Sequence, residues 1–478
     1  MSKKDLTRRD VLQRAVWLGA FLVAPHAASC GPESGSISNR SARPNFLFIF
    51  PDQHRFDWVP WNLSVPVRMP NLEELASRGV RFNWAFTPSP LCAPARACLA
   101  SGREYERCGV RNNAQDYPID QTTFYKLLRD NGYWVMGCGK FDLHKASPIW
   151  GLDGKNLIKE WGFSDGIDNS GKQDAVSSGR DKPKDPYMAF LERRGLRQAH
   201  IEDYRRRSQY GKSAVFPTPL PDDAYCDNWV GQNALNLIRS APKDRPWFLQ
   251  VNFVGPHYPW DITESMSKLY EGIDFPQPNG GDKLTPEQNV AVRRNYSAIL
   301  TNIDRWIGTF VDELRRRGQL ENTYIIYSSD HGEMLNDHGL WGKSVPYQPS
   351  VGVPLVIAGP GTKKSIVSDA LTSLIDLTAT FLDYAGVHQP SDMDGISLRS
   401  VLEGKTRKHR NYLRSGLEQW RLVFDGRYKL VKGYPERGDV CLYDLVKDPL
   451  ENHNVATQHK DIVESLSAYI VREQGENK

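Results

Sequence analysis

A cysteine followed by a proline and an arginine, in Cys92-Ala93-Pro94-Ala95-Arg96, is the first feature of the sequence that could carry out chemistry. Proline is well tolerated in the first turn of a helix, where its missing N–H costs nothing. The pattern therefore predicts Cys92 at a helix N-terminus, where unsatisfied N–H groups and the positive end of the dipole favour an anion. Arg96 would lie one turn further, on the same face. The alternative is a structural, buried cysteine before an ordinary helix.

Acidic side chains come at the ends of two predicted strands. Asp52 follows the apolar run Asn45–Phe50, and Asp330 follows Tyr324–Ser329. Two carboxylates at neighbouring strand ends repel each other unless a cation joins them. Because oxygen ligands suit a hard divalent ion, these residues predict a Ca²⁺ or Mg²⁺ site. In isolation, each aspartate would more often cap a strand end.

Together these residues resemble the type I sulfatases of the alkaline phosphatase-like superfamily. The segment from Cys92 to Arg103 resembles the Cys-x-Pro-x-Arg signature of that family and its downstream small-Gly-Arg ending. The resemblance implies that a maturation enzyme oxidises Cys92 to formylglycine, whose hydrate is the nucleophile. It also implies a metal ion, calcium or else magnesium, with the ligands Asp52, Gln53, Asp330, His331 and the modified Cys92. Gln53 and His331 stand where Asp and Asn are commonest, and the glutamine removes one negative charge.

Three more residues match family positions: Lys140, His257 and Lys343. A sulfate ester that builds up charge on its leaving oxygen needs fixed cations and a proton donor. The resemblance implies that these three residues bind the sulfate or assist the leaving group. Arg96 and Lys140 would hold the modified residue and the sulfate oxygens, and Asp330 would accept the proton of the nucleophile.

One position departs from the family pattern. The family usually has a histidine two residues after the lysine, whereas this chain has Asp142 there and His144 two residues further on. His144 could replace the usual histidine, and a structural role fits it equally well. His338, in the segment that leads to Lys343, is a further candidate for substrate binding.

Alternating strand and helix patterns must position these residues. Apolar runs such as Trp134–Cys138, Trp247–Val254 and Pro354–Ile357 alternate with helical segments. This order predicts an α/β fold with a mostly parallel central sheet sandwiched by helices, whose ligands bind beyond the carboxyl ends of the strands. We expect a catalytic domain over 44–403, with an insertion at about 150–245 that shapes a substrate cleft. A small C-terminal α+β subdomain over 404–478 would hold an antiparallel sheet and a helix.

The first thirty residues are typical of a targeting segment. Arg8-Arg9 resembles a twin-arginine export signal, and the apolar run after it is too short to span a bilayer. Cleavage near Ala28 would release a soluble protein, whereas lipid attachment at Cys30 would anchor it; a linker follows at 31–43. We therefore expect export by the twin-arginine machinery to the periplasm, the cell surface or the medium, with no membrane span in the mature chain.

Composition excludes several other classes of protein. The net charge of +4 over 478 residues is too small to argue for nucleic acid as a partner. The seven cysteines form no paired framework and no CxxC, so neither a disulfide scaffold nor a zinc ribbon is indicated.

The sequence thus predicts a sulfatase that acts on sulfated carbohydrates, because an exported enzyme with a long insertion and many aromatic residues suits a sugar substrate. A phosphate or phosphonate ester hydrolase of the same superfamily is the nearest alternative. A catalytically dead glycan-binding surface protein is a further one, against which the intact set of candidate residues argues.

Overall fold

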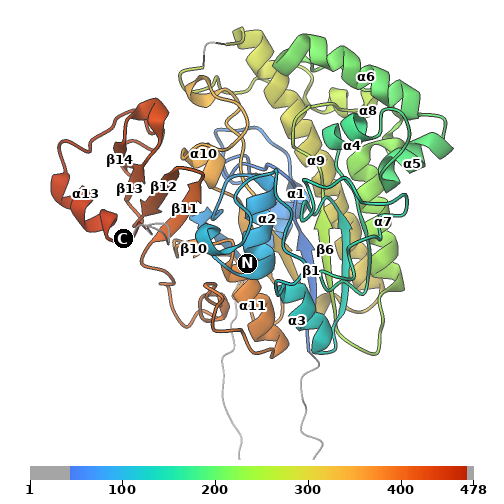
Figure 1. The fold of residues 1–478 in the computed structure, drawn as a ribbon, viewed down its shortest axis with the longest axis horizontal. Helices are drawn as coiled ribbons and strands as arrows, with labels where there is room; N and C mark the ends of the chain where they lie inside the picture. The colour runs from blue at the N-terminus through green and yellow to red at the C-terminus, as the bar shows by residue number, and fades with distance from the viewer. Residues whose placement is uncertain (1–42, 282, 471–478) are drawn as a thin grey trace, which may run out of the picture. The chain divides into compact units, whose positions relative to one another are not determined.

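Eight strands form the central sheet of the computed structural model, which describes residues 43–281 and 283–470 (Figure 1). Their order is β5-β4-β6-β1-β7-β8-β2-β9. Strand β8 runs antiparallel to both of its neighbours, and the other pairs are parallel. The predicted α/β fold with a mostly parallel sheet is therefore confirmed. The strands are β1 (Asn45–Ile49), β2 (Val80–Phe82), β4 (Trp134–Gly139), β5 (Asp165–Asp168), β6 (Trp247–Asn252), β7 (Thr323–Tyr327), β8 (Leu355–Ala358) and β9 (Ile366–Ser368).

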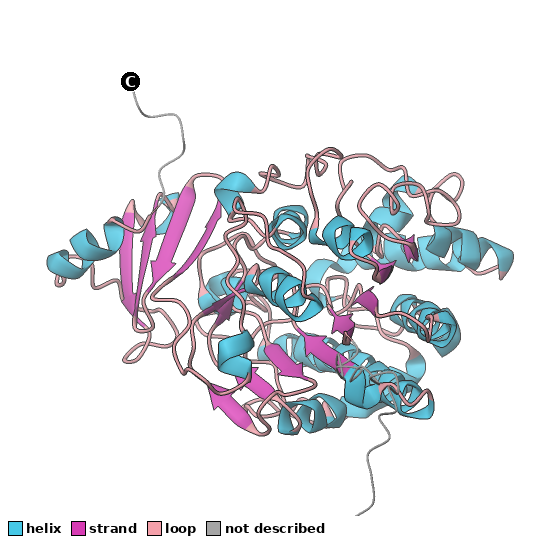
Figure 2. Ribbon diagram, turned by 90° about the horizontal axis from the view of Figure 1, so that it is seen from below, coloured by secondary structure: helices cyan, strands magenta, loops and turns pink. Residues whose placement is uncertain are grey.

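Helices cover both faces of this sheet (Figure 2). Side chains alternate along β1, so that Phe46 and Phe48 pack on one face while Leu47 and Ile49 pack on the other. Burial on both faces explains why the sequence of this strand is continuously apolar. The main covering helices are α1 (Pro70–Ser77), α2 (Cys92–Ser101), α3 (Phe124–Asp130), α7 (Cys226–Ser240), α9 (Pro286–Arg316) and α11 (Asp376–Ala385).

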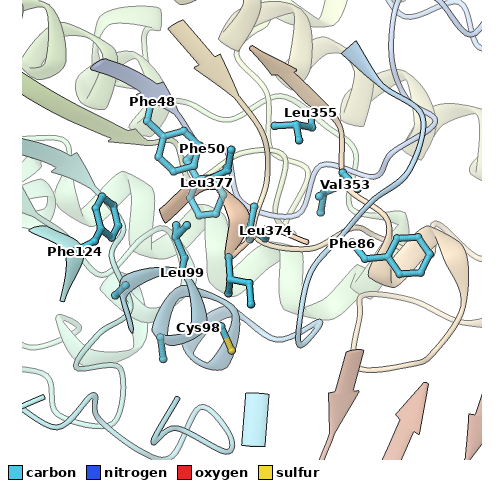
Figure 3. Packing of buried hydrophobic residues seen from close by; sticks show 14 of the residues in the cluster. Phe48, Phe50, Phe86, Cys98, Leu99, Phe124, Val353, Leu355, Leu374 and Leu377 are labelled. Carbon is cyan, nitrogen blue, oxygen red and sulfur yellow. The ribbon is translucent and has the colours of Figure 1, made fainter. Parts of the chain in front are cut away.

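Helix α2 is packed tightly behind the candidate site. All ten of its residues are buried. Figure 3 shows Phe48 and Phe50 from β1 and its end beside Leu99 of α2 and Leu377 of α11. Because close-packed interiors leave little room for movement, this cluster fixes the position of the helix and of its first residue, Cys92.

The long helix α9 begins with a complete capping box. The Thr285 hydroxyl accepts from the backbone N–H of Gln288, the Gln288 side chain accepts from the Thr285 N–H, and Pro286 occupies the first turn. These contacts satisfy backbone groups that the helix itself leaves open. They explain why the helix begins where the sequence pattern predicts.

The segment at 150–245, expected to be an insertion, also takes part in the central sandwich. Its strand β5 pairs with β4, and its helix α7 packs against β4 and β6. The polar sequence around β5 gave no strand signal, since an edge strand needs burial on fewer sides. The remaining helices of this segment are α4 (Gln173–Ser178), α5 (Pro186–Arg193) and α6 (Arg197–Tyr210).

A second, four-stranded antiparallel sheet follows, with the order β11-β12-β13-β14, and the helix α13 packs against it. The expected antiparallel C-terminal subdomain is thus confirmed. Shorter elements join the two sheets. The C-terminal and short elements are β11 (Leu413–Leu417), β12 (Trp420–Phe424), β13 (Tyr428–Lys432), β14 (Val440–Asp444), α13 (Lys460–Ser467), β3 (Ala85–Phe86), β10 (Thr372–Ser373), α8 (Glu264–Ser267), α10 (Gln348–Val351) and α12 (Arg399–Leu402).

Two sequence-based expectations concern residues that the structure does not describe. The export signal at 1–30, with Cys30, and the linker up to residue 42 lie outside the described residues. Over the described ranges, no helix combines the length and the apolarity that a membrane crossing needs.

Candidate active site

Residues from four adjacent strand ends meet at one edge of the central sheet. Asp52 follows β1, Lys140 follows β4, and Asp330 follows β7. His257 comes a few residues after β6. Because these strands are parallel neighbours, their carboxyl ends lie together, as expected for the ligand-binding edge of such a sheet.

Four buried side chains offer a set of metal ligands. One ligand atom each from Asp52, Cys92, Asp330 and His331 lies within 4.8 Å of all the others. Two carboxylates this close repel each other unless positive charge lies between or beside them. The donor set, two carboxylates and an imidazole, fits a divalent cation.

Gln53 lies beside this group, but its side chain bonds to residues outside it. Its backbone N–H donates to Asp330 Oδ1 at 3.0 Å, and the residue adopts a φ of 71°. Its side-chain amide donates to Glu333, while its Oε1 accepts from Lys343 Nζ at 2.7 Å. Among the expected metal ligands, Gln53 is therefore the one that the structure turns toward Lys343.

Cys92 is the first residue of α2, as the position of Pro94 predicts. Its Sγ lies 3.2 Å from His331 Nε2 and 3.7 Å from Lys140 Nζ. Burial and the Asp52 carboxylate raise the pKa of this thiol, but Lys140, Lys343 and His331 outweigh them and lower it overall. The site therefore favours a negative charge on the atom attached to Cβ of residue 92.

Arg96 and Lys140 place positive charge beside the Asp52 and Asp330 carboxylates. Arg96 Nη2 lies 3.0 Å from Asp330 Oδ2 and 3.5 Å from Asp52 Oδ2, and Nη1 donates to the Lys140 carbonyl at 2.6 Å. Lys140 Nζ pairs with Asp52 and lies 3.1 Å from Asp142 Oδ2. Burial opposes ionisation of Asp52, yet Lys140, His257, Arg96 and Lys343 together hold its pKa well below the ordinary value. The Asp52 carboxylate is thus available as an anionic ligand.

His257 and Lys343 form a contacting pair on the other side of the site. Lys343 Nζ lies 2.8 Å from His257 Nε2. The other ring nitrogen, Nδ1, bonds to the Tyr258 carbonyl, which can only accept, so Nδ1 carries the proton and Nε2 accepts from Lys343. Burial and the Lys343 charge lower the pKa of His257 well below its usual value, so the imidazole is neutral at neutral pH.

The structure does not bring His144 or His338 into this cluster. His144 Nε2 bonds to Asp168 Oδ2 at 2.7 Å and its Nδ1 to the Ser147 carbonyl at 2.8 Å, so both ring nitrogens are occupied. The His338 ring stacks on Tyr347, with the ring centroids 4.2 Å apart. Asp142, in contrast, does lie beside the site, through its contact with Lys140.

A cavity of about 200 Å³ opens beside these residues. Its lining includes Cys92, Lys140, His257 and Lys343. The remaining lining residues are polar for the most part, and five of them come from the segment at 145–174. They are Asn113, Lys145, Ser170, Lys172, Gln173, Asp174 and Val254.

Sequence reasoning missed several of the residues that complete the site. Asn252 Oδ1 accepts from Arg96 at 3.3 Å, and its place at the end of a buried strand was a usable signal. Glu333 lies in the same short motif as Asp330 and accepts from the backbone N–H of Gly342 at 2.6 Å. Lys145, in a polar stretch that resembles a surface loop, carried no such signal.

The C-terminal sheet holds the loop that carries Lys343. Lys429 of β13 is fully buried, and its Nζ donates to the Pro346 carbonyl at 2.7 Å. Trp420 of β12 donates from its indole N–H to the carbonyl of Ser344 at 3.2 Å. The C-terminal subdomain therefore helps to position a side chain of the candidate site.

Replacing Lys429 by methionine is expected to destabilise the protein strongly. Lys429 pairs with the buried Glu451 carboxylate, and the variant would leave that charge without its cation. Breaking a buried ion pair in this way costs about 3–5 kcal/mol in the free energy of unfolding, which urea titration would measure. The double variant K429M/E451Q should recover part of this loss, and a double variant no more stable than the single one would contradict the interpretation.

Comparison with known proteins agrees with this arrangement. The family model described as Sulfatase matches residues 44–387, and that described as N-sulphoglucosamine sulphohydrolase, C-terminal, matches 336–476. An arylsulfatase of Clostridium perfringens is 27% identical over 90% of this chain and 94% of its own length. An N-acetylglucosamine-6-O-sulfatase of Bacteroides thetaiotaomicron is 26% identical over 93% of this chain and 89% of its own length.

Solved structures share the fold. A phosphonate monoester hydrolase of Agrobacterium radiobacter superposes with a TM-score of 0.75 at 24% identity, over 89% of this chain and 94% of that one. A structure in complex with its substrate D-glucosamine-2-N,6-O-disulfate gives a TM-score of 0.72 at 21% identity, over 89% and 96% of the two chains. At these identities the likeness concerns the fold, whereas the family match spans most of the sequence. The chain therefore belongs to the sulfatase family of the alkaline phosphatase-like superfamily and is a sulfatase enzyme.

Proposed function

We propose that this sulfatase uses a formylglycine made from Cys92 and a bound divalent cation, calcium in the first place, to hydrolyse sulfate esters of carbohydrates. The observation that carries the proposal is the position of Cys92 Sγ. It lies at the N-terminus of α2, among the ligand atoms of Asp52, Asp330 and His331, all within 4.8 Å of one another.

The side chains fit such a cation. Asp52, Asp330, His331 and residue 92 would hold it directly, and Gln53 would join them if its amide turned from Lys343. When bound, the cation supplies Lewis-acid activation of an oxygen nucleophile. A hydrated formylglycine would supply that oxygen, together with a second hydroxyl through which sulfate can be released.

Arg96 and Lys140 prepare the site for attack. Arg96 is buried and bonds to the Asp330 carboxylate and the Lys140 backbone, so it fixes the position of both elements. The Lys140 ammonium lines the cavity next to Cys92 and can meet the oxygens of an incoming sulfate. Neither group needs to move during the reaction, which is the condition for effective electrostatic stabilisation.

Lys343 and His257 serve the leaving group. The ammonium of Lys343 faces two neutral partners, Gln53 Oε1 and His257 Nε2, so its charge is free to stabilise the departing oxygen. The neutral His257 orients it and can take part in passing the proton to the alcohol.

Replacing Lys343 by alanine should lower kcat/KM about 10²- to 10³-fold on sulfate esters of alcohols, the usual size of a lost acid or oxyanion partner. The loss should be smaller on 4-nitrophenyl sulfate, because its leaving group needs little assistance. Steady-state kinetics on both substrates test this, with Lys126→Ala, a lysine on α3 that bonds to backbone carbonyls, as a control. Equal losses on both substrates would show that Lys343 binds sulfate rather than the leaving oxygen.

A sulfated carbohydrate is the substrate class best supported. One relative is named an N-acetylglucosamine-6-O-sulfatase, and one solved structure of the same fold is a complex with its substrate D-glucosamine-2-N,6-O-disulfate. The polar lining of the cavity, with Asn113, Gln173 and Asp174, suits the hydroxyl groups of a sugar. Pockets for drug-sized ligands have about 300–1,000 Å³, so this smaller cavity suits a single ring.

Matched esters distinguish the proposed sulfatase activity from the alternative, hydrolysis of phosphonate or phosphate esters. We expect kcat/KM on 4-nitrophenyl sulfate and on sulfated monosaccharides to exceed that on 4-nitrophenyl phosphate and phenyl phosphonate esters. The reverse order would favour the phosphoester alternative, and no turnover of any ester would favour the dead-site alternative.

Export is also proposed, on the sequence alone. Arg8-Arg9, the short apolar run after them and Cys30 support passage through the twin-arginine machinery and then a periplasmic or lipid-anchored product. Cell fractionation of the full chain and of an R8K/R9K variant would test this. Retention of the variant in the cytoplasm is the expected result.

A further inference from the structure

Two groups of residues line the cavity beside Cys92. The first group is Cys92, Lys140, His257 and Lys343, which serve the reaction proposed above. The second group comes from the segment at 145–174, which has no part in the proposed chemistry. It contributes Lys145, Gln173 and Asp174, the last two from the short helix α4. A substrate that binds in this cavity would also meet this second group.

Each lysine of this second group is already paired with carboxylates. Lys145 Nζ lies 2.6 Å from Asp174 Oδ2 and 3.1 Å from Asp142 Oδ2. Lys172 Nζ lies 2.8 Å from Asp261 Oδ1, and both of these side chains are buried. These ammonium groups therefore present little net positive charge to a ligand.

Lys343 differs from these lysines, because the partners described above for it, Gln53 and His257, are neutral. Positive charge without a carboxylate partner is therefore found at Lys343, among the reacting groups, where one anionic group is expected. In the second group the more exposed charge is negative, since the Asp174 side chain is 45% exposed and that of Lys145 only 14%.

Asp174 would act differently on neutral and anionic substituents. Carboxylate oxygens that remain free after pairing with Lys145 can accept hydrogen bonds from sugar hydroxyls, and Gln173 adds an amide. A carboxylate or second sulfate on the sugar would instead face the like charge of Asp174. Such repulsion between ligand and protein is a general means of rejecting the wrong substrate.

We propose that this cavity selects sugar rings whose single anionic group is the sulfate ester that is cleaved, and that Asp174 excludes a second anionic group. The proposal deepens the proposed function and rests on it. It makes Asp174 a residue that determines specificity, outside the groups that carry out the reaction.

Two sugars that differ in charge at one position provide the test. N-Acetylglucosamine 6-sulfate and glucosamine 2-N,6-O-disulfate share the 6-sulfate, and only the second carries another anionic group. The wild-type chain should prefer the monosulfate by about tenfold or more in kcat/KM, and Asp174→Asn should reduce that preference about tenfold, which corresponds to one modest charge–charge interaction. If neither sugar is cleaved, the same ratio is read from their inhibition constants against hydrolysis of 4-nitrophenyl sulfate.

Asp223→Asn is the matched control, because Asp223 lies, like Asp174, in the segment at 150–245 and pairs with a basic side chain (Arg194, at 2.8 Å), but it does not line the cavity. Its preference should equal that of the wild type. Because Asp174 is partly exposed, the wild-type preference should also shrink as salt is added. A wild-type preference for the disulfate, or an unchanged ratio in Asp174→Asn, would overturn the proposal. Failure to hydrolyse any sulfate ester would instead refute the proposed function itself.

Discussion

Cys92→Ala is expected to lose multiple turnover, with kcat lowered by at least about 10³-fold, because removing a covalent nucleophile leaves only the binding and electrostatic contributions. The alanine fits the space and keeps the apolar packing, since later residues of the same helix, such as Cys98 and Leu99, belong to the apolar cluster and Cys92 does not. Thermal unfolding should therefore be nearly unchanged. Steady-state assays on a sulfate ester measure the loss.

Cys92→Ser separates the nucleophile from its modification. A serine hydroxyl at this position can attack sulfur once but offers no second hydroxyl through which sulfate can be released. The expected result is a burst of at most one alcohol per active site, followed by arrest, with one SO₃ group retained on the peptide that contains residue 92. Rapid-quench kinetics and peptide mass spectrometry would record both.

The control for both variants is Cys98→Ala, on the same helix and equally buried but outside the candidate site. It should keep most of the activity and lose some stability, as expected for a buried side chain that is shortened. In the wild-type chain from a host with the maturation enzyme, mass spectrometry should find an aldehyde at residue 92. A fully active protein with unmodified Cys92 would refute the formylglycine proposal.

Asp330→Asn is expected to have the second largest effect, a loss of about 10²- to 10⁴-fold in kcat/KM, because one change removes a proposed metal ligand and the partner of Arg96. The variant would also leave the Arg96 guanidinium with less negative charge around it. Treatment of the wild-type chain with a chelator should produce a comparable loss, and added Ca²⁺ should restore it.

Metal affinity gives a readout that does not depend on activity. Ligands that bind the folded state raise its stability by mass action, so Ca²⁺ should raise the unfolding temperature of the wild-type chain but not of Asp330→Asn. Asp304→Asn is the matched control, a buried aspartate on α9 that accepts from the backbone of Leu72 and lies outside the ligand group. It should keep its response to Ca²⁺. An equal response in Asp330→Asn would exclude this residue as a ligand.

The sequence by itself determined the central strands of the sheet and the local setting of Cys92. The apolar run before Asp52 predicted a strand buried on both faces, and the spacing from Cys92 to Pro94 predicted the start of a helix; both are confirmed. These features depend on residues only a few positions apart, so periodicity and first-turn preferences are sufficient to predict them. The strand-end positions of Asp52 and Asp330 follow from the same local patterns.

Only the tertiary structure decided which side chains meet. Lys140 and Asp52 are 88 residues apart in the sequence, and Lys343 and Gln53 are 290 apart, so no local pattern reports their contacts. His144 follows the lysine motif closely in sequence, yet its ring bonds to Asp168, which lies 24 positions further along the chain. Burial of the two sheet faces brings distant strands together, and with them the loops at their ends. Contacts of this kind depend on that arrangement. The sequence therefore predicted which residue types could take part in the site, and the fold decided which of these side chains meet.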